Sequence, residues 1–344
     1  MIKSTLQKIL EREHLTRAEA YAAMNTIMNG EATAAQIGAL LVALRMKGEQ
    51  PEEIAGFAAC MRDKSEKVLS PRARHAVDLV GTGGDGKATF NISTVASFVV
   101  AGADVPVAKH GNRAVSSQCG SADVLNALGV NIELNAEQLG QCLDEVGLAF
   151  LFAPKLHPAM KHAVAPRREL GVRTVFNILG PITNPAGVRR QLIGVYDRKL
   201  LRLLAEVLLQ LEAEHIMLVH GAEGMDEISL AVATFVAELR DNEIREYEIS
   251  AESFGLQTRT NDATGGDANT NAQIALRILG GEECEGREIV IANAAAGLYV
   301  AGAAGSLQEG AVLAQKSLTI GAAMQKLEAL RAFTQRMNFD FQIP

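Results

Sequence analysis

The sequence predicts an α/β protein that consists of a small all-helical domain and a large α/β domain with a central, mostly parallel sheet. Up to about residue 65 the chain carries only helix signals, and after Ser70-Pro71 short apolar runs alternate with helical segments. The length of 344 residues allows about two domains, at about 150 residues each. A hydrophobic content of 48% with 21% charged residues is typical of a globular protein and excludes long disordered regions.

Charge and cysteine content narrow the class of protein. Lys and Arg number 33 and Asp and Glu number 40, so the formal net charge is −7, which argues against a general nucleic-acid binder. The cysteines, at 60, 119, 142 and 284, form no CxxC pair and have no metal-ligand spacing, which is typical of a reducing compartment. Residues 1–13 lack the apolar core of a signal peptide. We therefore expect a cytoplasmic protein.

Capping signals divide the first 65 residues into helices. Thr16 with Glu19 forms a T-x-x-E capping box. Thr33 with Gln36 repeats the pattern, and Pro51 is typical of the first turn of a further helix. Apolar side chains form a stripe on the helix after Thr33, at Ile37, Leu40, Leu41 and Leu44. If the rest of the chain leaves part of this stripe uncovered, we expect it to be a subunit contact.

Short apolar runs in the α/β region are predicted to be strands. They lie at residues 76–80, 105–108, 148–152, 191–196, 216–220 and 288–291. Helices are predicted at residues 136–146, 199–211 and 271–279, and a further helix begins at about Ser93. This alternation predicts a largely parallel sheet, whereas residues 234–249 have the pattern of an antiparallel excursion. The uncharged stretch 289–305, which contains Asn293, is interpreted as a buried strand that runs into a tightly packed helix.

A glycine-rich segment follows the first predicted strand. Residues 81–94 read GTGGDGKATFNIST, and they join this strand to the helix that begins near Ser93. Glycines permit left-handed turns and a close approach of the backbone to a ligand. Bare backbone N–H groups and the dipole of a helix start favour a phosphate at such a position. A turn that binds nothing would need neither these glycines nor the series of hydroxyl and amide side chains that follows them.

Three kinds of phosphate ligand compete for this segment. Gly81, Gly86 and Lys87 nearly complete the Walker pattern GxxxxGK[ST], but Ala88 replaces the hydroxyl that would bind magnesium. The segment also satisfies the dinucleotide pattern GxGxxG, but Asp104 precedes the second strand instead of following it. A phosphorylated sugar that bears a diphosphate explains both the hydroxyl-rich helix start and the composition of a second loop.

The second loop, KHGNRAVSS at residues 109–117, follows the next predicted strand. It carries two cations, an imidazole, an amide and two hydroxyl groups, which together suit a polyanion. Loops at the carboxyl ends of neighbouring parallel strands meet in one crevice, where open α/β sheets bind their ligands. The simpler alternative is that Lys109 and Arg113 are solvated surface charges.

These segments together resemble the anthranilate phosphoribosyltransferase family, within the nucleoside phosphorylase-like class of phosphoribosyltransferases. The similarity rests on the two loops and on CGSADVLNALG at 119–129, HPAM at 157–160, Arg167, RTVFNILGP at 173–181, HG at 220–221 and MDEI at 225–228. It covers essentially the whole chain. It implies a helical dimerisation domain at residues 1–70 plus about 165–190, and a catalytic α/β domain at residues 71–164 and 191–344.

The resemblance also implies a reaction and the residues that serve it. The family transfers a 5-phosphoribosyl group from 5-phosphoribosyl 1-diphosphate to the amine of anthranilate, the second step of tryptophan biosynthesis from chorismate. The residues implied to bind the phosphoribosyl diphosphate are Gly81, Gly84, Asp85, Thr89, Asn91, Ile92, Ser93, Thr94, Lys109, His110, Gly111, Asn112, Arg113, Ala114, Val115, Ser116, Ser117 and Ser121. Those implied to bind anthranilate are Gly81, His110, Asn112, His157, Arg167 and Pro181.

Magnesium is the implied cofactor, with two ions per subunit. Its implied ligands are Ser93, Asp226 and Glu227, which offer the hard oxygen atoms that this ion prefers. No general acid or base is expected, because an arylamine is largely neutral at pH 7 and is already nucleophilic. Lys109, Asn112 and Arg167 are expected to act through charge and position instead. The family forms homodimers through the helical domain, and we expect the two domains to close around the crevice.

Two other functions suit the same architecture. A pyrimidine nucleoside phosphorylase would bind phosphate, instead of magnesium diphosphate, beside the glycine-rich segment, and the presence of Asp226 and Glu227 argues against it. A noncatalytic relative that binds nucleic acid should have lost parts of the diphosphate site and gained a basic stripe. The net charge of −7 does not favour such a protein. We therefore expect neither nucleic acid nor a membrane as a partner.

Overall fold

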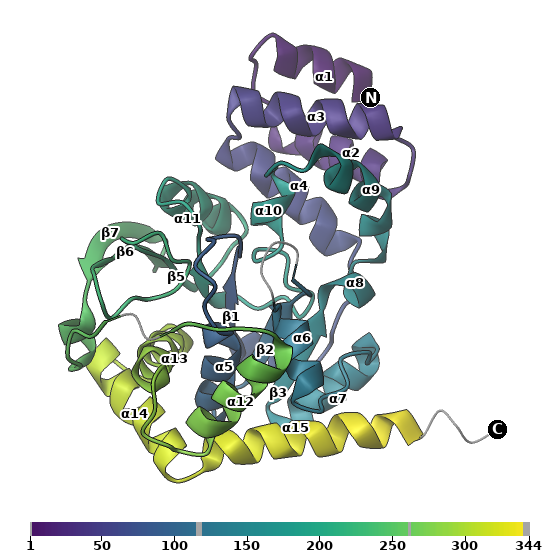
Figure 1. The fold of residues 1–344 in the computed structure, drawn as a ribbon. Coiled ribbons are helices and arrows are strands. Elements are labelled where there is room, and N and C mark those ends of the chain that lie inside the picture. Colours follow the sequence, from purple (N-terminus) through teal and green to yellow (C-terminus); the bar gives the residue numbers. More distant parts are fainter. Residues whose placement is uncertain (1, 115–118, 261–262, 340–344) are drawn as a thin grey trace.

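The computed structural model describes residues 2–114, 119–260 and 263–339, with side chains up to residue 337. A helical part lies above an α/β part in the view of Figure 1. The helices are α1 (Ile2–Leu10), α2 (Arg17–Met28), α3 (Ala34–Lys47), α4 (Pro51–Asp63), α5 (Ile92–Gly102), α6 (Ser121–Ala127), α7 (Ala136–Val146), α8 (Ala153–Leu156), α9 (Lys161–Leu170), α10 (Phe176–Leu179), α11 (Leu200–Gln210), α12 (Ala268–Leu279), α13 (Arg287–Ala301), α14 (Leu307–Thr319) and α15 (Ala322–Phe339). The strands are β1 (Val77–Gly81), β2 (Val107–Gly111), β3 (Leu148–Phe152), β4 (Arg190–Gly194), β5 (His215–Gly221), β6 (Thr234–Arg240) and β7 (Glu243–Ile249).

The capping signals near the N-terminus are confirmed. The Thr16 hydroxyl accepts the N–H of Glu19 at 3.2 Å, and the Glu19 carboxylate accepts the N–H of Thr16 at 2.8 Å. Thr33 and Gln36 form the same reciprocal pair at the start of α3. Each pair satisfies backbone donors that a helix start leaves without partners, which explains why α2 and α3 begin at these positions.

The apolar stripe on α3 is covered within the chain. Ile37, Leu40, Leu41 and Leu44 are at most 2% exposed. They belong to a core formed with the other N-terminal helices, and α3 contacts both α1 and α9. No part of the stripe is left for a second subunit, so this stripe is an internal core and not the subunit contact that the sequence allowed.

The seven strands form one sheet with the order β3-β2-β1-β4-β5-β6-β7. The strands from β3 to β5 in this order are parallel, and β6 and β7 are antiparallel, as predicted for residues 234–249. The chain moves outward in one direction from β1 to β3 and in the other from β4 to β7. The boundary between β1 and β4 is therefore the topological switch point, where open α/β sheets leave a crevice at the carboxyl ends of their strands.

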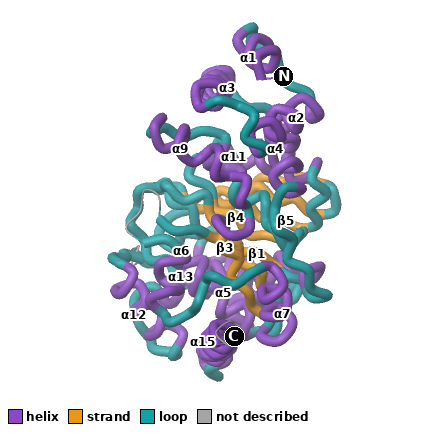
Figure 2. Tube along the Cα trace, turned by 90° about the vertical axis from the view of Figure 1, so that its right-hand side faces the viewer, coloured by secondary structure: helices purple, strands orange, loops and turns teal. Residues whose placement is uncertain are grey.

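Both faces of the sheet are covered, as Figure 2 shows, with α11 on one side and α5, α13 and α15 on the other. Along β5, Met217 and Val219 join the core beneath α5 and α13, whereas Ile216 and Leu218 join the core shared with the helical part. Successive side chains of a strand point to opposite faces, so a sheet buried on both faces needs the continuous apolar runs seen in this sequence.

The predicted strand at 288–291 is wrong, because this segment is the beginning of α13. Gly286 has φ of +80° and precedes the helix, and nearly every residue from Ile289 to Val300 is buried. A helix that is apolar on all sides has no 3.6-residue period, so its pattern cannot be distinguished from that of a buried strand. Small residues let α13 approach β1 and α5, since a Cβ on Gly297 would lie 3.1 Å from side-chain atoms of Leu79 and Val100.

The second strand also differs from its prediction. It spans Val107–Gly111 and not 105–108, so Lys109 and His110 belong to the strand itself and not to the loop after it. The strand at 148–152 and the helix at 136–146 have the predicted bounds, and the other predicted strands and helices that form are offset by three residues or fewer at either end. Among the described residues, the structure contains no helix with the length and apolar character needed to cross a membrane.

Candidate active site

Two glycines face each other at the switch point of the sheet. Gly81 ends β1 and pairs in register with Gly194, which ends β4. Asp226 lies against both of them. A Cβ on Gly81 would lie 2.7 Å from its carboxylate Oδ2, and a Cβ on Gly194 would collide with its backbone carbonyl. The absence of side chains at these two strand ends therefore makes room for an acidic residue from the loop between β5 and β6.

The glycine-rich segment takes the backbone conformation that its composition predicts. Gly83, Gly84 and Gly86 all have positive φ angles, between +66° and +77°, and no atom lies within 4 Å of a Cβ on Gly83 or Gly86. The N–H of Gly83 donates to the carboxylate of Asp226 at 2.7 Å. The carboxylate of Asp85 accepts the N–H of Lys87 at 3.1 Å. The exposed amides that remain in this segment suit a polyanion.

Asp226 and Glu227 form an acidic pair, in which Asp226 is buried and Glu227 is half-buried. The Glu227 carboxylate accepts the N–H of Ser93, at the start of α5, at 3.1 Å. Burial raises the pKa of Asp226, and the nearby carboxylate of Asp85 raises it further. Burial also raises the pKa of Glu227, with a further contribution from the charge of Asp226. Adjacent carboxylates held away from water have a strong tendency to acquire either protons or a cation.

Lys109 provides the buried cation of the site. It is 3% exposed, and its ammonium group donates to the carbonyl of Leu79 and to the hydroxyl of Ser93, the latter at 3.2 Å. Burial lowers the pKa of Lys109, which the charges of Asp78 and Glu227 oppose. The alternative of a solvated surface charge is therefore wrong for Lys109. A lysine that lies beneath a helix start is held where it can neutralise an anion.

Arg113 differs from Lys109, because its side chain is half exposed. It forms an ion pair with Asp123 at 3.0 Å, and its guanidinium lies 5.6 Å from the centre of the Phe152 ring. The Asp123 carboxylate also accepts the N–H groups of Ala114 and Gly120, at 3.1 and 2.9 Å. Asp123 thus connects Ala114, in the second loop, to Gly120, which precedes α6. The predicted residues Val115, Ser116 and Ser117 lie outside the described residues.

The rest of the second loop packs closely around Gly111. A Cβ on Gly111 would collide with the hydroxyl of Ser121 and with the ring of Phe150. The carbonyl of Asn112 accepts the hydroxyl of Ser121 at 3.2 Å, and its side-chain oxygen accepts the N–H of Arg113 at 2.8 Å. These contacts bring Gly111, Asn112 and Ser121 together, as the sequence predicts.

The start of α5 presents the polar side chains of the first loop. Thr89 bridges to Thr264, and the Asn91 side chain donates to the carbonyl of Cys119 at 3.2 Å, so this segment contacts the chain just before α6. Ile92 is buried in the core. The Thr94 hydroxyl is buried and has no hydrogen-bond partner among the described residues. A buried hydroxyl without a partner is costly, so Thr94 is a candidate ligand contact.

His110 and His157 lie together beside Pro181. Their ring centres are 5.2 Å apart, and the Nδ1 of His110 lies 3.0 Å from the carbonyl of Gly180. Burial lowers the pKa of His110 to about 3 and that of His157 to about 4. Both rings are therefore neutral at pH 7. The Nε2 atoms of both are buried and have no partner among the described residues, which leaves a pair of neutral imidazole edges for a flat ligand.

Arg167 lies on α9, at the side of the helical part. Its guanidinium is 4.9 Å from the centre of the Phe176 ring, and burial lowers the pKa of Arg167. Within the described ranges, no hydrogen bond joins this side chain to the other predicted site residues. Arg167 is thus the predicted residue that the structure does not connect to the rest of the site.

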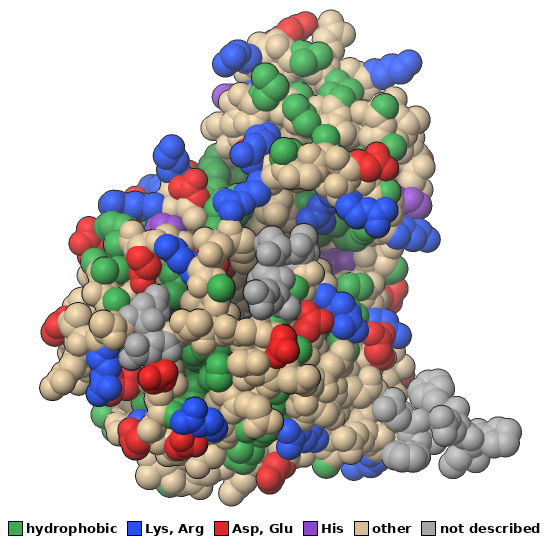
Figure 3. Space-filling model, viewed as in Figure 1, with side chains coloured by type: hydrophobic (Ala, Val, Ile, Leu, Met, Phe, Trp, Pro, Cys, Tyr) green, Lys and Arg blue, Asp and Glu red, His purple; other side chains and the backbone are tan. Residues whose placement is uncertain are grey.

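Arg173 was not predicted to belong to the site, although it lies within a quoted motif. Its guanidinium donates to the carbonyl of Gly84 and lies 4.1 Å from the centre of the Tyr196 ring. Its own carbonyl accepts a hydrogen bond from Arg45, on α3, at 2.5 Å. Arg173 therefore connects the helical part to the glycine-rich segment. On the face shown in Figure 3, Lys and Arg side chains gather at the level where the two parts meet.

Two further buried polar residues hold the loops, and sequence reasoning missed both. Asn271, on α12, donates to the side-chain oxygen of Asn91 at 3.0 Å and accepts the N–H of Gly266 at 2.7 Å. Asp78 accepts the N–H of His110 at 3.1 Å and the amide of Asn184 at 2.8 Å. A polar residue inside an apolar strand or helix is the signal that could have identified them.

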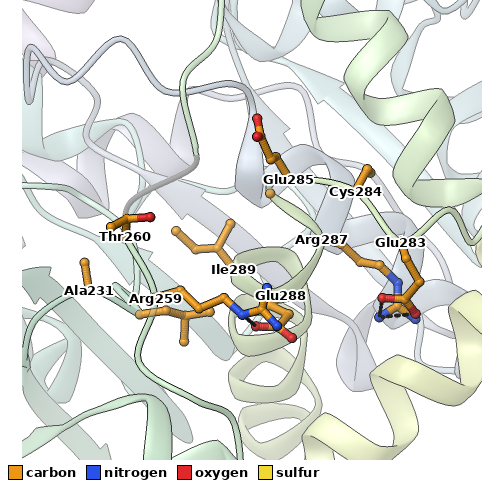
Figure 4. Close-up of a pocket in the computed structure, with 11 residues that line it drawn as sticks. Ala231, Arg259, Thr260, Glu283, Cys284, Glu285, Arg287, Glu288 and Ile289 are labelled. Atoms are coloured by element: carbon orange, nitrogen blue, oxygen red, sulfur yellow. Dashed lines mark hydrogen bonds and ion pairs between the residues drawn. The ribbon is translucent and has the colours of Figure 1, made fainter.

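A cavity of about 280 Å³ lies at the start of α13, away from these residues (Figure 4). None of the predicted site residues lines it. Both arginines that line it already pair with glutamates of the same cavity, Arg259 with Glu288 at 2.6 Å and Arg287 with Glu283 at 3.3 Å. We therefore place the candidate active site at the switch point and not in this cavity.

In comparisons with known proteins, the helical N-terminal segment and the α/β part match separate family models. A family model described as the glycosyl transferase family, helical bundle domain, matches residues 3–65, and the model of the a/b domain of that family matches residues 73–324. A curated relative from Acetivibrio thermocellus, named anthranilate phosphoribosyltransferase, is 49% identical over 335 residues, which are 97% of each protein.

Two solved structures are similar throughout their length. Anthranilate phosphoribosyltransferase from Thermus thermophilus is 43% identical with a TM-score of 0.90, and the match covers 96% of this chain and 99% of that one. The enzyme from Saccharomyces cerevisiae, in complex with PRPP and Mg, is 26% identical with a TM-score of 0.88 and coverage of 97% and 98%. The predicted fold class is confirmed, and the chain belongs to the anthranilate phosphoribosyltransferase family.

Proposed function

We propose that this protein transfers the 5-phosphoribosyl group of 5-phosphoribosyl 1-diphosphate to the amine of anthranilate and releases diphosphate, the second step of tryptophan biosynthesis from chorismate. One observation carries the proposal. The glycine-rich segment meets the acidic pair Asp226 and Glu227 and the buried ammonium group of Lys109 at the topological switch point. Open amides, a cation and a pair of carboxylates are the groups that a magnesium-bound diphosphate requires.

The donor would lie across the ends of β1 and β2. The backbone of residues 81–85 offers N–H groups to the diphosphate, and Thr89, Asn91, Ser93 and Thr94 offer polar side chains at the positive end of α5. The second loop, with Ser121, closes the other side. Breaking the bond between the ribose and the diphosphate places negative charge on the leaving group, so donors fixed before the reaction stabilise it.

Magnesium fits the acidic pair. Burial and the neighbouring carboxylates raise the pKa values of Asp226 and Glu227, so a cation bound between them would relieve an unfavourable charge. Ser93 adds a hydroxyl oxygen, and hard oxygen atoms are the ligands that magnesium prefers. The described residues contain no cluster of three or more His, Cys, Asp and Glu that could hold a metal alone, which suits an ion that shares its ligands with a phosphorylated substrate. When bound, magnesium neutralises charge on the diphosphate. We propose two ions per subunit.

The acceptor would lie between the second loop and α9. Arg167 offers a guanidinium to the carboxylate of anthranilate, and Asn112 offers an amide. His110, His157 and Pro181 would form an uncharged wall beside the ring, and the backbone of Gly81 would line the other side. No residue needs to remove a proton before the attack, because the arylamine is neutral at pH 7. The rate then depends on holding the amine against the ribose carbon.

The test is fluorescence-monitored consumption of anthranilate with 5-phosphoribosyl 1-diphosphate and magnesium. We expect turnover by the wild type and a nearly complete loss in the double variant Asp226→Ala/Glu227→Ala. The matched control is Glu246→Ala/Glu248→Ala, an exposed acidic pair on β7, which should keep its activity. Unchanged turnover in the first variant would refute the metal assignment, and an inactive wild type would refute the proposed function.

The two alternative functions have direct tests. Phosphorolysis of thymidine would identify a pyrimidine nucleoside phosphorylase, and tight binding of single-stranded DNA at moderate salt would identify a nucleic-acid-binding relative. Neither is favoured, because the acidic pair has no role in them and the net charge is −7.

We further propose that residues 1–70 and about 165–190 form the helical domain, through which a homodimer assembles, and that residues 71–164 and 191–344 form the catalytic domain. Support comes from the packing of α9 on α3 and from the place of Phe176 in the core of the helical part. Large apolar side chains are exposed on this domain at Leu10, Met46, Leu69 and Val172, and Val164 is exposed beside its boundary on α9. The described cysteines form no disulfide, which supports a cytoplasmic location.

A further inference from the structure

We propose that Asn293 is a positioning residue that holds the two magnesium-binding carboxylates in place from within α13. It does so through both backbone groups of Ile228, the residue that follows Glu227. The proposal rests on the proposed function, since it assigns a role in the metal site to a residue outside that site.

Asn293 is an unusual residue for its surroundings. It is fully buried, and it is the only side-chain amide in the uncharged stretch 289–305. A buried amide without partners destabilises a fold, whereas an apolar residue would need no hydrogen-bond partners. The amide is therefore expected to have a specific use.

The contacts of the amide identify that use. Its oxygen accepts the N–H of Ile228 at 3.1 Å, and its nitrogen donates to the carbonyl of Ile228 at 3.3 Å. The same nitrogen donates to the carbonyl of Ile289, one turn earlier in α13, at 2.9 Å. The side chain thus pairs with both polar groups of one residue, as a neighbouring strand would, although Ile228 lies in a loop.

This pairing fixes the end of the acidic segment. On one side, the backbone of Asp226 is pressed against Gly194, and its carboxylate accepts the N–H of Gly83. On the other side, Ile228 is held by Asn293. Glu227 lies between the two attachments, and its carboxylate reaches the N–H of Ser93. Both carboxylates are therefore held by contacts on either side of them.

The need for such a contact follows from charge. Asp226, Glu227 and Asp85 repel one another when they are ionised, and the repulsion favours any movement of the loop that separates them. Without the amide of Asn293, the Ile228 backbone would have to find other partners and the loop would shift. Groups that orient metal ligands typically change metal affinity about 10- to 100-fold when they are lost.

Replacement of Asn293 by Ala tests the proposal. We expect Asn293→Ala to weaken Mn²⁺ binding, measured by electron paramagnetic resonance in the presence of 5-phosphoribosyl 1-diphosphate, by about tenfold or more. The Mg²⁺ concentration for half-maximal activity should rise similarly, while the KM for anthranilate changes less than about twofold, because the acceptor is proposed to bind beside His110 and His157 and not on this loop. Amide exchange at Ile228 should also become faster.

The matched control is Ser317→Ala. Ser317 is also buried and donates to the carbonyl of Val99 at 2.8 Å, in the same core, and within the described residues it makes no hydrogen bond to the acidic loop. We expect a loss of thermal stability with unchanged Mn²⁺ binding. A folded Asn293→Ala protein that binds Mn²⁺ like the wild type would overturn the proposal, as would an equal loss of binding in Ser317→Ala.

A second variant covers the case in which Asn293→Ala does not fold. Asn293→Asp has the same size and keeps the acceptor for the Ile228 N–H but loses the donor, so Mn²⁺ binding should weaken here as well, and unchanged binding would again overturn the proposal. Failure of the proposed function has a different signature, since the wild type would then bind no Mn²⁺ with the donor or would not consume anthranilate.

Discussion

At the scale of single residues, Asp226 fits into the site because its neighbours Gly81 and Gly194 have no side chains. Gly194 ends strand β4 and is not among the glycines with a positive φ angle. The conformational freedom of the glycine backbone therefore does not explain its presence here. The explanation is contact, because the backbone carbonyl of Asp226 occupies the place where its Cβ would be. Such a requirement is invisible along the chain, since the two residues are far apart in the sequence.

The first prediction concerns this contact. In Gly194→Ala, the added methyl group should push Asp226 away, lower the free energy of unfolding by about 1–3 kcal/mol and reduce kcat/KM by about 100-fold or more. Steady-state kinetics and chemical denaturation measure both effects. The control is Gly38→Ala, on α3. A Cβ at this position would meet no atom closer than 4.0 Å, and alanine favours a helix. Wild-type kinetics in Gly194→Ala would contradict the contact.

The second prediction concerns the buried imidazole of His157. Burial lowers its pKa to about 4 in the folded protein, from about 6.5 in an unfolded chain. Between these values the unfolded chain binds more protons, so His157 stabilises the fold less as the pH falls. We expect the wild type to lose about 2 kcal/mol relative to His157→Gln between pH 7 and pH 4.5, measured by chemical denaturation.

A comparison at each pH is needed because Asp78 acts in the opposite direction. Burial raises its pKa to about 6, so the folded state binds the extra proton and acidification favours the fold. Asp78 is present in both proteins, and its contribution cancels in their difference. His75→Gln, at an exposed histidine, is the control for the substitution. A difference that is independent of pH would contradict the assignment of His157 as a buried neutral imidazole.

At the scale of elements, helices that contribute no predicted site residue hold the loops that do. From α12, Asn271 connects Gly266 to Asn91, and Asn91 in turn connects to Cys119. A chain of two side-chain amides, Asn271 buried and Asn91 half-buried, thus joins α12 and the start of α5 to Cys119, just before α6. Each loop is polar and needs partners on its inner side, and the neighbouring helix provides them.

The third prediction tests this chain of amides. Asn271→Leu removes the partners of Asn91 and Gly266 and should raise the KM for 5-phosphoribosyl 1-diphosphate by about tenfold, the size expected for about 1.4 kcal/mol. The KM for anthranilate should stay within about twofold. Asn269→Leu, at an exposed position on α12, is the matched control. Equal changes in both KM values would indicate a general loss of structure and would contradict the specific role.

At the scale of the whole molecule, two cores meet along one sheet, and the proposed site lies where the helical part approaches the strand ends. The apolar stripe around Leu40 and Leu44 is buried inside the helical part and is not available to a second subunit. Among the apolar side chains exposed on and beside its outer surface are Met46 on α3, at 78%, and Val164 on α9, at 52%. The two helices contact each other.

The fourth prediction concerns the oligomeric state. Met46→Glu/Val164→Glu should sediment as a monomer at concentrations where the wild type sediments as a dimer, because charges on an apolar contact oppose its burial. Ile320→Glu, at an exposed apolar residue after α14 in the α/β part, should remain a dimer. A wild type that is monomeric throughout, or a double variant that stays dimeric, would contradict the proposed surface. Leu40→Glu would not serve, since it would destabilise the core.

Local signals in the sequence were sufficient for much of the fold. Capping boxes at Thr16 and Thr33, the apolar run at 148–152 and the glycine-rich segment at 81–94 each act within a few residues, so their structures could be predicted from the chain alone. The start of α13 could not, because a segment buried on all sides has no period. The register of β2, which places Lys109 in the strand and under cover, depends on its pairing with β3.

By itself, therefore, the amino-acid sequence determined which chemical groups this protein brings to a phosphorylated substrate, because glycines, hydroxyl groups and paired carboxylates have these properties in any fold. Only the tertiary structure decided which of them meet. Three sets of contacts join residues that are distant in the sequence: Gly81 and Gly194 make room for Asp226, Lys109 is buried beneath the start of α5, and Asn293 binds the backbone of Ile228. Their energies come from excluded volume and from burial, which exist only once the sheet and its helices have packed.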